Sequence, residues 1–142
     1  MLLIDTSVWI SFFNDAKSHA AAFVEDTLLS HHGACINIVI EMEILQGIRD
    51  DRHYHTTKTY LEDFQYYPIL GREYYDLSVE IFRASRKKGI SVRRSLDCLI
   101  AANAIINGLT IAHQDRDFDL IKKVFPELRT INILKRVQSP RI

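Results

Sequence analysis

Four acidic residues are candidates for chemistry, namely Asp5, Glu43, Asp97 and Asp115. Glu43 and Asp97 lie in strongly apolar segments, where an isolated ionised carboxylate would be costly to bury. A shared cation would offset the mutual repulsion of such carboxylates. Ligand sets made only of oxygen favour Mg²⁺ or Mn²⁺ over zinc or copper. A site of this kind suits phosphodiester hydrolysis, in which the metal polarises the phosphate and lowers the pKa of the attacking water.

Each of these acids also has a purely structural interpretation. Asp5 could cap the helix that follows it, and Asp97 could be a first-turn acid favoured by the helix dipole. Asp115 could open a turn, and Glu43 could be a solvated helix residue. For any one of them alone the structural interpretation is the commoner one, because structural acids far outnumber catalytic ones. The four together favour a cation site.

The hydrophobic pattern predicts short strands that alternate with helices. Strands are expected over residues 1–4, 35–37, 67–70, 109–112 and 130–134. Helices are expected over residues 6–13, 18–30, 38–48, 54–64, 74–88, 95–106 and 117–124. Thr6 or Ser7 is expected to cap the first helix and Ser95 the sixth, and Pro68 places the third strand at or near an edge. The alternation predicts an α/β fold, with a parallel sheet covered by helices on both faces.

The predicted topology brings the four acids to one edge of the sheet. Asp5 directly follows the first strand and Asp115 lies three residues past the fourth, so both belong at the carboxyl edge of a parallel sheet. The helix that carries Asp97 precedes a strand and runs antiparallel to it, so its first turn returns to the same edge. The helix that carries Glu43 starts at this edge and holds that residue in its first half. Open α/β folds bind their ligands here.

Composition limits the classes of protein that this chain can belong to. No repeat, low-complexity tract or linker divides the sequence, which predicts one domain over residues 1–142. The 18 basic and 18 acidic side chains argue against binding nucleic acid through bulk positive charge. Cys35 and Cys98 form no CxxC pair, which argues against a zinc ribbon or a redox dithiol. We find neither a signal stretch nor an apolar run long enough to span a bilayer, and therefore expect a cytoplasmic protein.

Four segments, in order and spacing, resemble the motifs of the PIN domain, and most closely those of VapC-type toxins from toxin–antitoxin pairs. They are Leu3-Ile-Asp-Thr-Ser-Val-Trp-Ile10, Glu43-Ile-Leu-Gln-Gly47, Leu96-Asp-Cys-Leu-Ile-Ala-Ala102 and Asp115-Arg-Asp-Phe118. The resemblance covers nearly the whole chain. One such motif alone would be a weak signal, whereas four in order are specific.

The resemblance implies a three-layer α/β/α PIN-like domain with a short-stranded parallel sheet. It implies that Asp5, Glu43, Asp97 and Asp115 form a catalytic site that binds Mg²⁺ or Mn²⁺ and cleaves RNA as an endoribonuclease. It also implies a homodimer, and a small cognate antitoxin that blocks the site of this toxin of a type II pair. The chain departs from the family at His113, because Thr or Ser usually stands two residues before the last acid. There an imidazole replaces a hydroxyl that would help to orient the metal ligands or water.

Other residues and functions remain open at this point. Arg93 and Arg94 immediately precede a site helix and could contact the RNA backbone, while His113 either contacts substrate or metal-bound water or packs at a strand end. A phosphatase with Asp5 as nucleophile would want a second acid two residues on, where this chain has Ser7. A non-catalytic PIN-fold binding module would be expected to lose acids, and this chain keeps all four.

Overall fold

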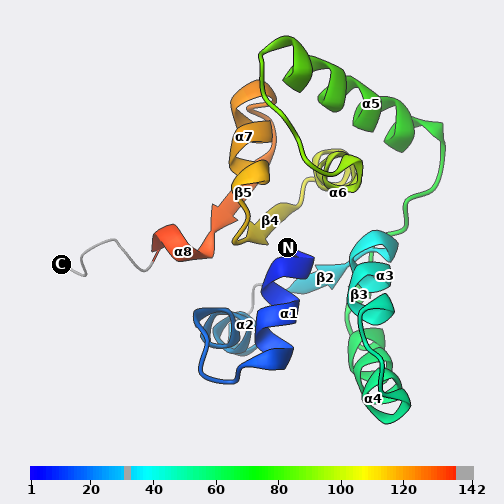
Figure 1. Cartoon of the computed structure of the whole chain (residues 1–142), viewed down its shortest axis with the longest axis vertical. Helices are drawn as coiled ribbons and strands as arrows, with labels where there is room; N and C mark the ends of the chain where they lie inside the picture. Colours follow the sequence, from blue (N-terminus) through cyan, green and yellow to red (C-terminus); the bar gives the residue numbers. More distant parts are fainter. Residues whose placement is uncertain (31–32, 137–142) are drawn as a thin grey trace.

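A computed structural model describes residues 1–30 and 33–136. Within these residues, parallel strands form a five-stranded sheet in the order β3-β2-β1-β4-β5 (Figure 1). The strands are β1 (Leu2–Ile4), β2 (Ala34–Ile36), β3 (Gln65–Tyr66), β4 (Thr110–His113) and β5 (Arg129–Asn132). The strand order reverses at β1, because β2 and β4 lie on opposite sides of it. Ligands of open α/β sheets bind beside the carboxyl ends of the strands at such a switch point.

Helices cover both faces of the sheet, which confirms the expected three-layer α/β/α architecture. Parallel crossovers are right-handed, so connections that leave β1 in opposite directions place their helices on opposite faces. Accordingly, α1 packs against α2 and α3, whereas α5 packs against α6 and α7 (Figure 1). None of the helices in the described ranges is long and apolar enough to cross a membrane. The helices are α1 (Thr6–Asn14), α2 (His19–Leu29), α3 (Ile38–Gln46), α4 (Asp51–Glu62), α5 (Arg72–Lys87), α6 (Ser95–Asn107), α7 (Arg116–Val124) and α8 (Ile133–Arg136).

Two of the candidate site acids are also helix caps. The side chain of Asp5 accepts a hydrogen bond from the backbone N of Ser7 at the start of α1. The side chain of Asp115 does the same with the backbone N of Asp117 at the start of α7. The expectation that Thr6 or Ser7 caps α1 is therefore wrong, because the extended backbone of Asp5 passes straight from β1 into the helix. This arrangement fixes both carboxylates at the carboxyl edge of the sheet.

Two further helix starts differ from the expectation. Ser95 is the first helical residue of α6 and Arg94 holds the cap position without a side-chain cap bond, so the predicted Ser95 cap is wrong. The helix expected over residues 54–64 begins earlier, because Asp50 caps α4 by accepting a hydrogen bond from the backbone N of His53. An N-cap side chain of this kind satisfies a backbone donor that the helix leaves open.

The third strand is displaced from its predicted place. It was expected over residues 67–70 and is found at Gln65–Tyr66, at the edge of the sheet. The backbone N of Tyr67 still donates to the carbonyl oxygen of Ile36 at 2.9 Å. Because Tyr67 donates toward β2, the nitrogen of Pro68 faces the open edge of the sheet, where a missing N–H breaks no ladder bond. The edge position that Pro68 predicts is confirmed.

The last strand is shorter than predicted. It was expected over residues 130–134, whereas β5 ends at Asn132 and is followed directly by α8. The Asn132 side-chain oxygen accepts a hydrogen bond from the backbone N of Leu134 at 3.1 Å. This local bond competes with continued strand pairing and starts a helical turn instead.

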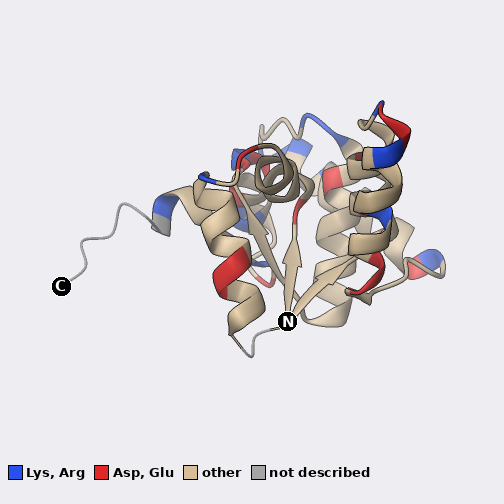
Figure 2. Cartoon of the chain, turned by 90° about the horizontal axis from the view of Figure 1, so that it is seen from below, with Lys and Arg blue, Asp and Glu red and all other residues tan. Residues whose placement is uncertain are grey.

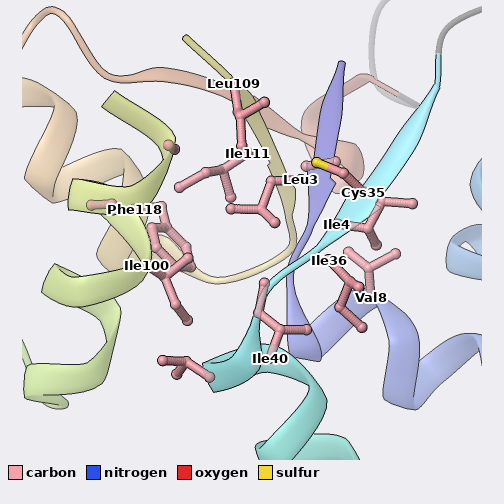
Figure 3. Packing of buried hydrophobic residues seen from close by; sticks show 14 of the residues in the cluster. Leu3, Ile4, Val8, Cys35, Ile36, Ile40, Ile100, Leu109, Ile111 and Phe118 are labelled. Atoms are coloured by element: carbon pink, nitrogen blue, oxygen red, sulfur yellow. The ribbon is translucent and has the colours of Figure 1, made fainter. Parts of the chain in front are cut away.

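Aliphatic side chains from the strands fill the space between the layers, as Figure 3 shows for Leu3, Ile4 and Ile111. The largest fully buried side chains are Trp9 on α1 and Phe118 on α7. Complete burial of each side chain of this type contributes about 1.5–3 kcal/mol to the free energy of unfolding. The two helices that begin at Asp5 and Asp115 therefore each contribute one of the largest core side chains, which packs that helix against the sheet.

Candidate active site

The carboxyl ends of β1 and β4 form the edge at which the four acids are expected. In Figure 2 the N-terminus marks the edge where β1 begins, and acidic segments lie near the opposite ends of the strands, close to basic segments. The acids and their partners there come from α1, α3, α6, α7 and the loop before α6.

Asp5 is the first residue after β1 and is fully buried. Its Oδ2 atom accepts hydrogen bonds from the Ser7 Oγ at 2.6 Å and from the Ser7 backbone N at 3.1 Å. Its Oδ1 atom is buried and has no hydrogen-bond partner among the described residues. Burial raises the pKa of Asp5, and the bonds from Ser7 lower it in part.

Glu43 lies on the buried face of α3. Its Oε1 atom accepts a hydrogen bond from the Thr6 Oγ1 at 3.0 Å, and its Oε2 atom accepts one from the Arg94 Nη1 at 2.6 Å. Thr6 and Ser7 are adjacent, so the start of α1 orients two acids from different parts of the chain. Gly47 lies one turn further along α3. A Cβ at this position would meet only the backbone oxygens of Ile44 and Glu43, so nothing here crowds the Glu43 carboxylate.

Asp97 is fully buried in the first turn of α6. Its Oδ1 atom accepts a hydrogen bond from the Arg94 Nη2 at 2.9 Å, whereas its Oδ2 atom has no partner among the described residues. Burial raises the pKa of Asp97 to about 7, although Arg94 opposes this shift. The charges of Asp5 and Asp115 raise it further, which reflects how close the three carboxylates lie to one another.

Asp115 and Asp117 lie at the start of α7. Carboxylate oxygens of Asp97, Asp115 and Asp117 all come within 4.8 Å of one another. Asp117 is almost fully buried, and its Oδ1 atom has no partner within the described ranges. Asp117 was not predicted as a site residue, because in the sequence it has the pattern of an ordinary first-turn helix acid.

Three buried carboxylate oxygens therefore lack a hydrogen bond from the described part of the chain: Asp5 Oδ1, Asp97 Oδ2 and Asp117 Oδ1. In each of these side chains the other oxygen accepts a hydrogen bond, so each carboxylate is held from one side. Buried polar atoms are normally satisfied, and a bound cation would satisfy these. Because the donor set is all oxygen, the residues present fit Mg²⁺ or Mn²⁺.

Arg93 and Arg94 each join two of the acids. The Arg93 Nη2 lies 3.1 Å from Asp115 Oδ1 and its Nε lies 3.2 Å from Asp117 Oδ2. Arg94 bridges Glu43 and Asp97 in the same manner. The two arginines thus pair with the acids of the site, and a contact with RNA backbone stays a prediction.

His113 is fully buried at the end of β4. Its Nδ1 atom accepts a hydrogen bond from the backbone N of Asp115 at 3.2 Å, and its ring packs against Phe118 with the centroids 5.3 Å apart. Burial lowers the pKa of His113, although nearby acids, Asp119 first among them, oppose the shift. Of the two roles considered for His113, packing at the strand end agrees with this burial, and the imidazole also holds the loop that carries Asp115.

A pocket of about 280 Å³ adjoins the site on the side of Glu43. Its walls come from α1, α3 and the start of α4, and Ile10, Phe13, Ile44 and Ile48 supply apolar surface. The buried carboxylate of Glu43 therefore lies beside a cavity that is open to the surface.

A family model for the PIN domain matches residues 2–124. The chain belongs to the PIN-domain family. Two mycobacterial relatives of this PIN domain are 39% identical to it over 126 residues, which cover 87% of this chain and 93% of theirs. They are the VapC ribonuclease of Mycobacterium bovis and Ribonuclease VapC11 of Mycobacterium tuberculosis. The predicted resemblance to VapC-type PIN domains is thereby confirmed.

Solved structures show the same fold at much lower sequence identity. The DNA-bound VapBC of Salmonella typhimurium matches this PIN domain with a TM-score of 0.74 and 20% identity, over 92% of this chain and 96% of that one. VapBC2 of Rickettsia felis, bound to a promoter DNA fragment, matches with a TM-score of 0.73 and 15% identity over the same shares of the two chains. At these identities the two structures bear on the fold alone.

Proposed function

We propose that this PIN domain is a metal-dependent endoribonuclease, the toxin of a type II toxin–antitoxin pair, with Mg²⁺ as cofactor and Mn²⁺ as a substitute. The observation that carries the proposal is the set of buried carboxylate oxygens, on Asp5, Asp97 and Asp117, that have no partner within residues 1–30 and 33–136. Both mycobacterial relatives are named ribonucleases, which supports RNA as the substrate.

In this proposal Asp5, Glu43, Asp97 and Asp115 form the site, and Asp117 joins them. A bound cation would polarise the scissile phosphate and lower the pKa of a water molecule. The Ser7 and Thr6 hydroxyls hold Asp5 and Glu43 in place, because fixed hydrogen bonds keep ligands within the narrow geometry that hydrolysis needs.

The proposal predicts that Asp5→Asn lowers metal-dependent RNA cleavage by on the order of a hundredfold or more. Asn keeps the side-chain volume and an oxygen that can cap α1, but it removes the negative charge that faces the cation. Cleavage of a labelled RNA should be followed with Mg²⁺, with Mn²⁺ and with EDTA. Asp15→Asn is the matched control, because Asp15 is an exposed acid at the other end of α1. Full cleavage by Asp5→Asn, or cleavage by the wild type in EDTA, would contradict the proposal.

The same assay separates the two rival functions. A non-catalytic binding module would bind RNA without cutting it under any metal condition. A phosphatase with Asp5 as nucleophile would release phosphate from phosphomonoesters and leave the RNA chain intact. The Ser7 hydroxyl, which stands where such a phosphatase would want a second acid, holds Asp5 Oδ2 at 2.6 Å.

We also propose a small cognate antitoxin that covers the acidic edge and blocks cleavage. The two solved structures described above are VapBC proteins, and VapBC-5 of Mycobacterium tuberculosis, which has a similar fold, belongs to the VapBC family of toxin–antitoxin systems. These similarities support a protein partner. A small DNA-binding protein encoded next to this chain is the candidate. In the cleavage assay, its addition at a matched concentration should stop the reaction, and undiminished cleavage would count against this partner.

We further propose a homodimer of a single domain over residues 1–142. Apolar side chains stay exposed on α3 and α5 of the isolated chain, among them Met42 at 44% and Val79 at 57% exposure. These side chains are available for contact with a second copy of the chain. Light scattering at micromolar concentration should give twice the 16.5 kDa chain mass, and a stable monomer would refute the dimer.

A further inference from the structure

The loop before α6 places two guanidinium groups against the site. Arg94 lies at the cap position of α6 and has 45% of its side chain exposed, so its charged end reaches the acids from the solvent side. It makes two charge-assisted hydrogen bonds, of 2.6 Å to Glu43 and 2.9 Å to Asp97. Such bonds are shorter and stronger than those between neutral groups.

Arg94 is thus a cation of the chain itself between two carboxylates of the proposed metal site. In the absence of any other cation, the clustered acids would repel one another, and Arg94 and Arg93 offset that repulsion. A divalent cation ligated by Glu43 and Asp97 would use the same carboxylates and would place additional positive charge beside the guanidinium. Both oxygens of Glu43 already accept hydrogen bonds, from Thr6 and Arg94, so a cation ligated by Glu43 competes with Arg94 for Oε2. Asp97 keeps Oδ2 without a partner among the described residues, and there the cation and the guanidinium would share one carboxylate and repel each other.

We infer that Arg94 is an internal counter-ion, which stabilises the site without metal and is displaced from Glu43 and Asp97 when the divalent cation binds. The inference rests on the proposed function, because it requires a metal at these carboxylates. Arg94 would then control the affinity for the metal, because part of the free energy of metal binding is used to break the two bonds from Arg94 to Glu43 and Asp97. Arg94 would therefore raise the metal concentration that is needed to fill the site.

The test is an isothermal calorimetric titration of the metal-free protein with Mn²⁺ in the absence of RNA. Arg94→Gln removes the charge and the double bridge, and we expect it to lower the Kd for Mn²⁺ by about tenfold. Arg116→Gln is the matched control, because Arg116 lies between Asp115 and Asp117 in sequence, is exposed and makes no ion pair within the described ranges. It removes the same charge near the site without breaking a bridge, so its effect should stay below about threefold.

A second measurement guards against a folding defect. Metal-free Arg94→Gln should melt below the wild type, and the difference should shrink when both are saturated with Mn²⁺, because Arg94 no longer contributes to the metal-bound state. Arg94→Lys keeps the charge, but an ammonium group lacks the planar fork with which Arg94 bridges two carboxylates. The Kd of Arg94→Lys for Mn²⁺ should therefore lie between that of the wild type and that of Arg94→Gln.

The possible outcomes are distinct. An Arg94→Gln protein that binds Mn²⁺ as the wild type does, or more weakly, would overturn the inference, because Arg94 would then hold the ligands in place for the metal. An effect no larger than that of Arg116→Gln would overturn it as well, because only the net charge would matter. A wild type that binds no Mn²⁺ would overturn the proposed function itself, and the inference with it.

Discussion

Asp97→Asn is expected to stabilise the metal-free protein at pH 8 by about 2 kcal/mol, or roughly 6 °C in Tm. It is also expected to remove the stabilisation that the proposed site predicts for the wild type in Mn²⁺. Asp97 is fully buried, and burial raises its pKa to about 7. At a pH above this value Asp97 is ionised, and the free energy needed to bury its charge lowers the stability of the folded state. Asn has no charge to bury, and its side-chain oxygen can still accept the hydrogen bond from Arg94.

The raised pKa of Asp97 decides at which pH the substitution stabilises the protein. A pKa of about 7 in the folded chain lies above the unfolded value of about 3.9, so between these values the folded state binds more protons than the unfolded state. Stability from this group therefore falls as pH rises from about 4 through 7. The advantage of Asp97→Asn should be full at pH 8 and vanish near pH 4.

Thermal melts of both proteins at pH 4, 6 and 8, each with EDTA and with Mn²⁺, measure these effects. Asp26→Asn on α2 is the control, because Asp26 is exposed and its removal should shift Tm little at any pH. An Asp97→Asn protein that melts below the wild type in EDTA at pH 8 would show that the carboxylate stabilises the fold, contrary to this account.

Glu43→Gln is expected to lower RNA cleavage by on the order of a hundredfold, whereas Glu41→Gln should change it little. The two residues share α3, and residues two apart point to roughly opposite faces of a helix. Glu43 is buried between Thr6 and Arg94. Glu41 is half-buried and lies near Tyr66, whose pKa is raised by burial and then by the Glu41 charge.

The comparison needs cleavage rates and melting curves for both variants at saturating Mg²⁺. Glu41→Gln should alter the free energy of unfolding by less than about 0.5 kcal/mol, as a substitution outside the core. Two folded variants with equal activity, or with Glu41→Gln as the slower one, would remove Glu43 from the proposed site.

The convergence of distant acids could be predicted from the sequence because chain direction decides it. In a parallel sheet every strand ends at the same edge, so Asp5 after β1 and Asp115 after β4 must come close. A helix that leads into a strand begins at that edge, which accounts for Asp97. None of these steps requires the conformation of a single side chain.

Features that depend on side-chain conformation could not be predicted in this way. Arg94 occupies a cap position from which a long side chain could equally extend into solvent, and only its bonds to Glu43 and Asp97 decide between the two. Asp117 has the pattern of an ordinary first-turn acid, and its burial depends on how α7 packs. The short β3 forms at the exposed, polar Gln65–Tyr66 and not over the apolar run at residues 67–70, so the apolar pattern misplaces it.

Asp5 and Asp115 cap helices in addition to the role proposed for them in the site, and this restricts how the sequence could change over evolutionary time. Each side chain accepts the backbone bond that starts a helix, and loss of an N-cap costs about 0.5–2 kcal/mol. Ala at either position would therefore remove the charge and also weaken the fold, whereas Asn or Ser would remove the charge and keep the cap. A descendant that abandoned catalysis but kept this fold is thus expected to carry Asn, Ser or Thr at positions 5 and 115, and such substitutions in related sequences would mark loss of activity without loss of structure.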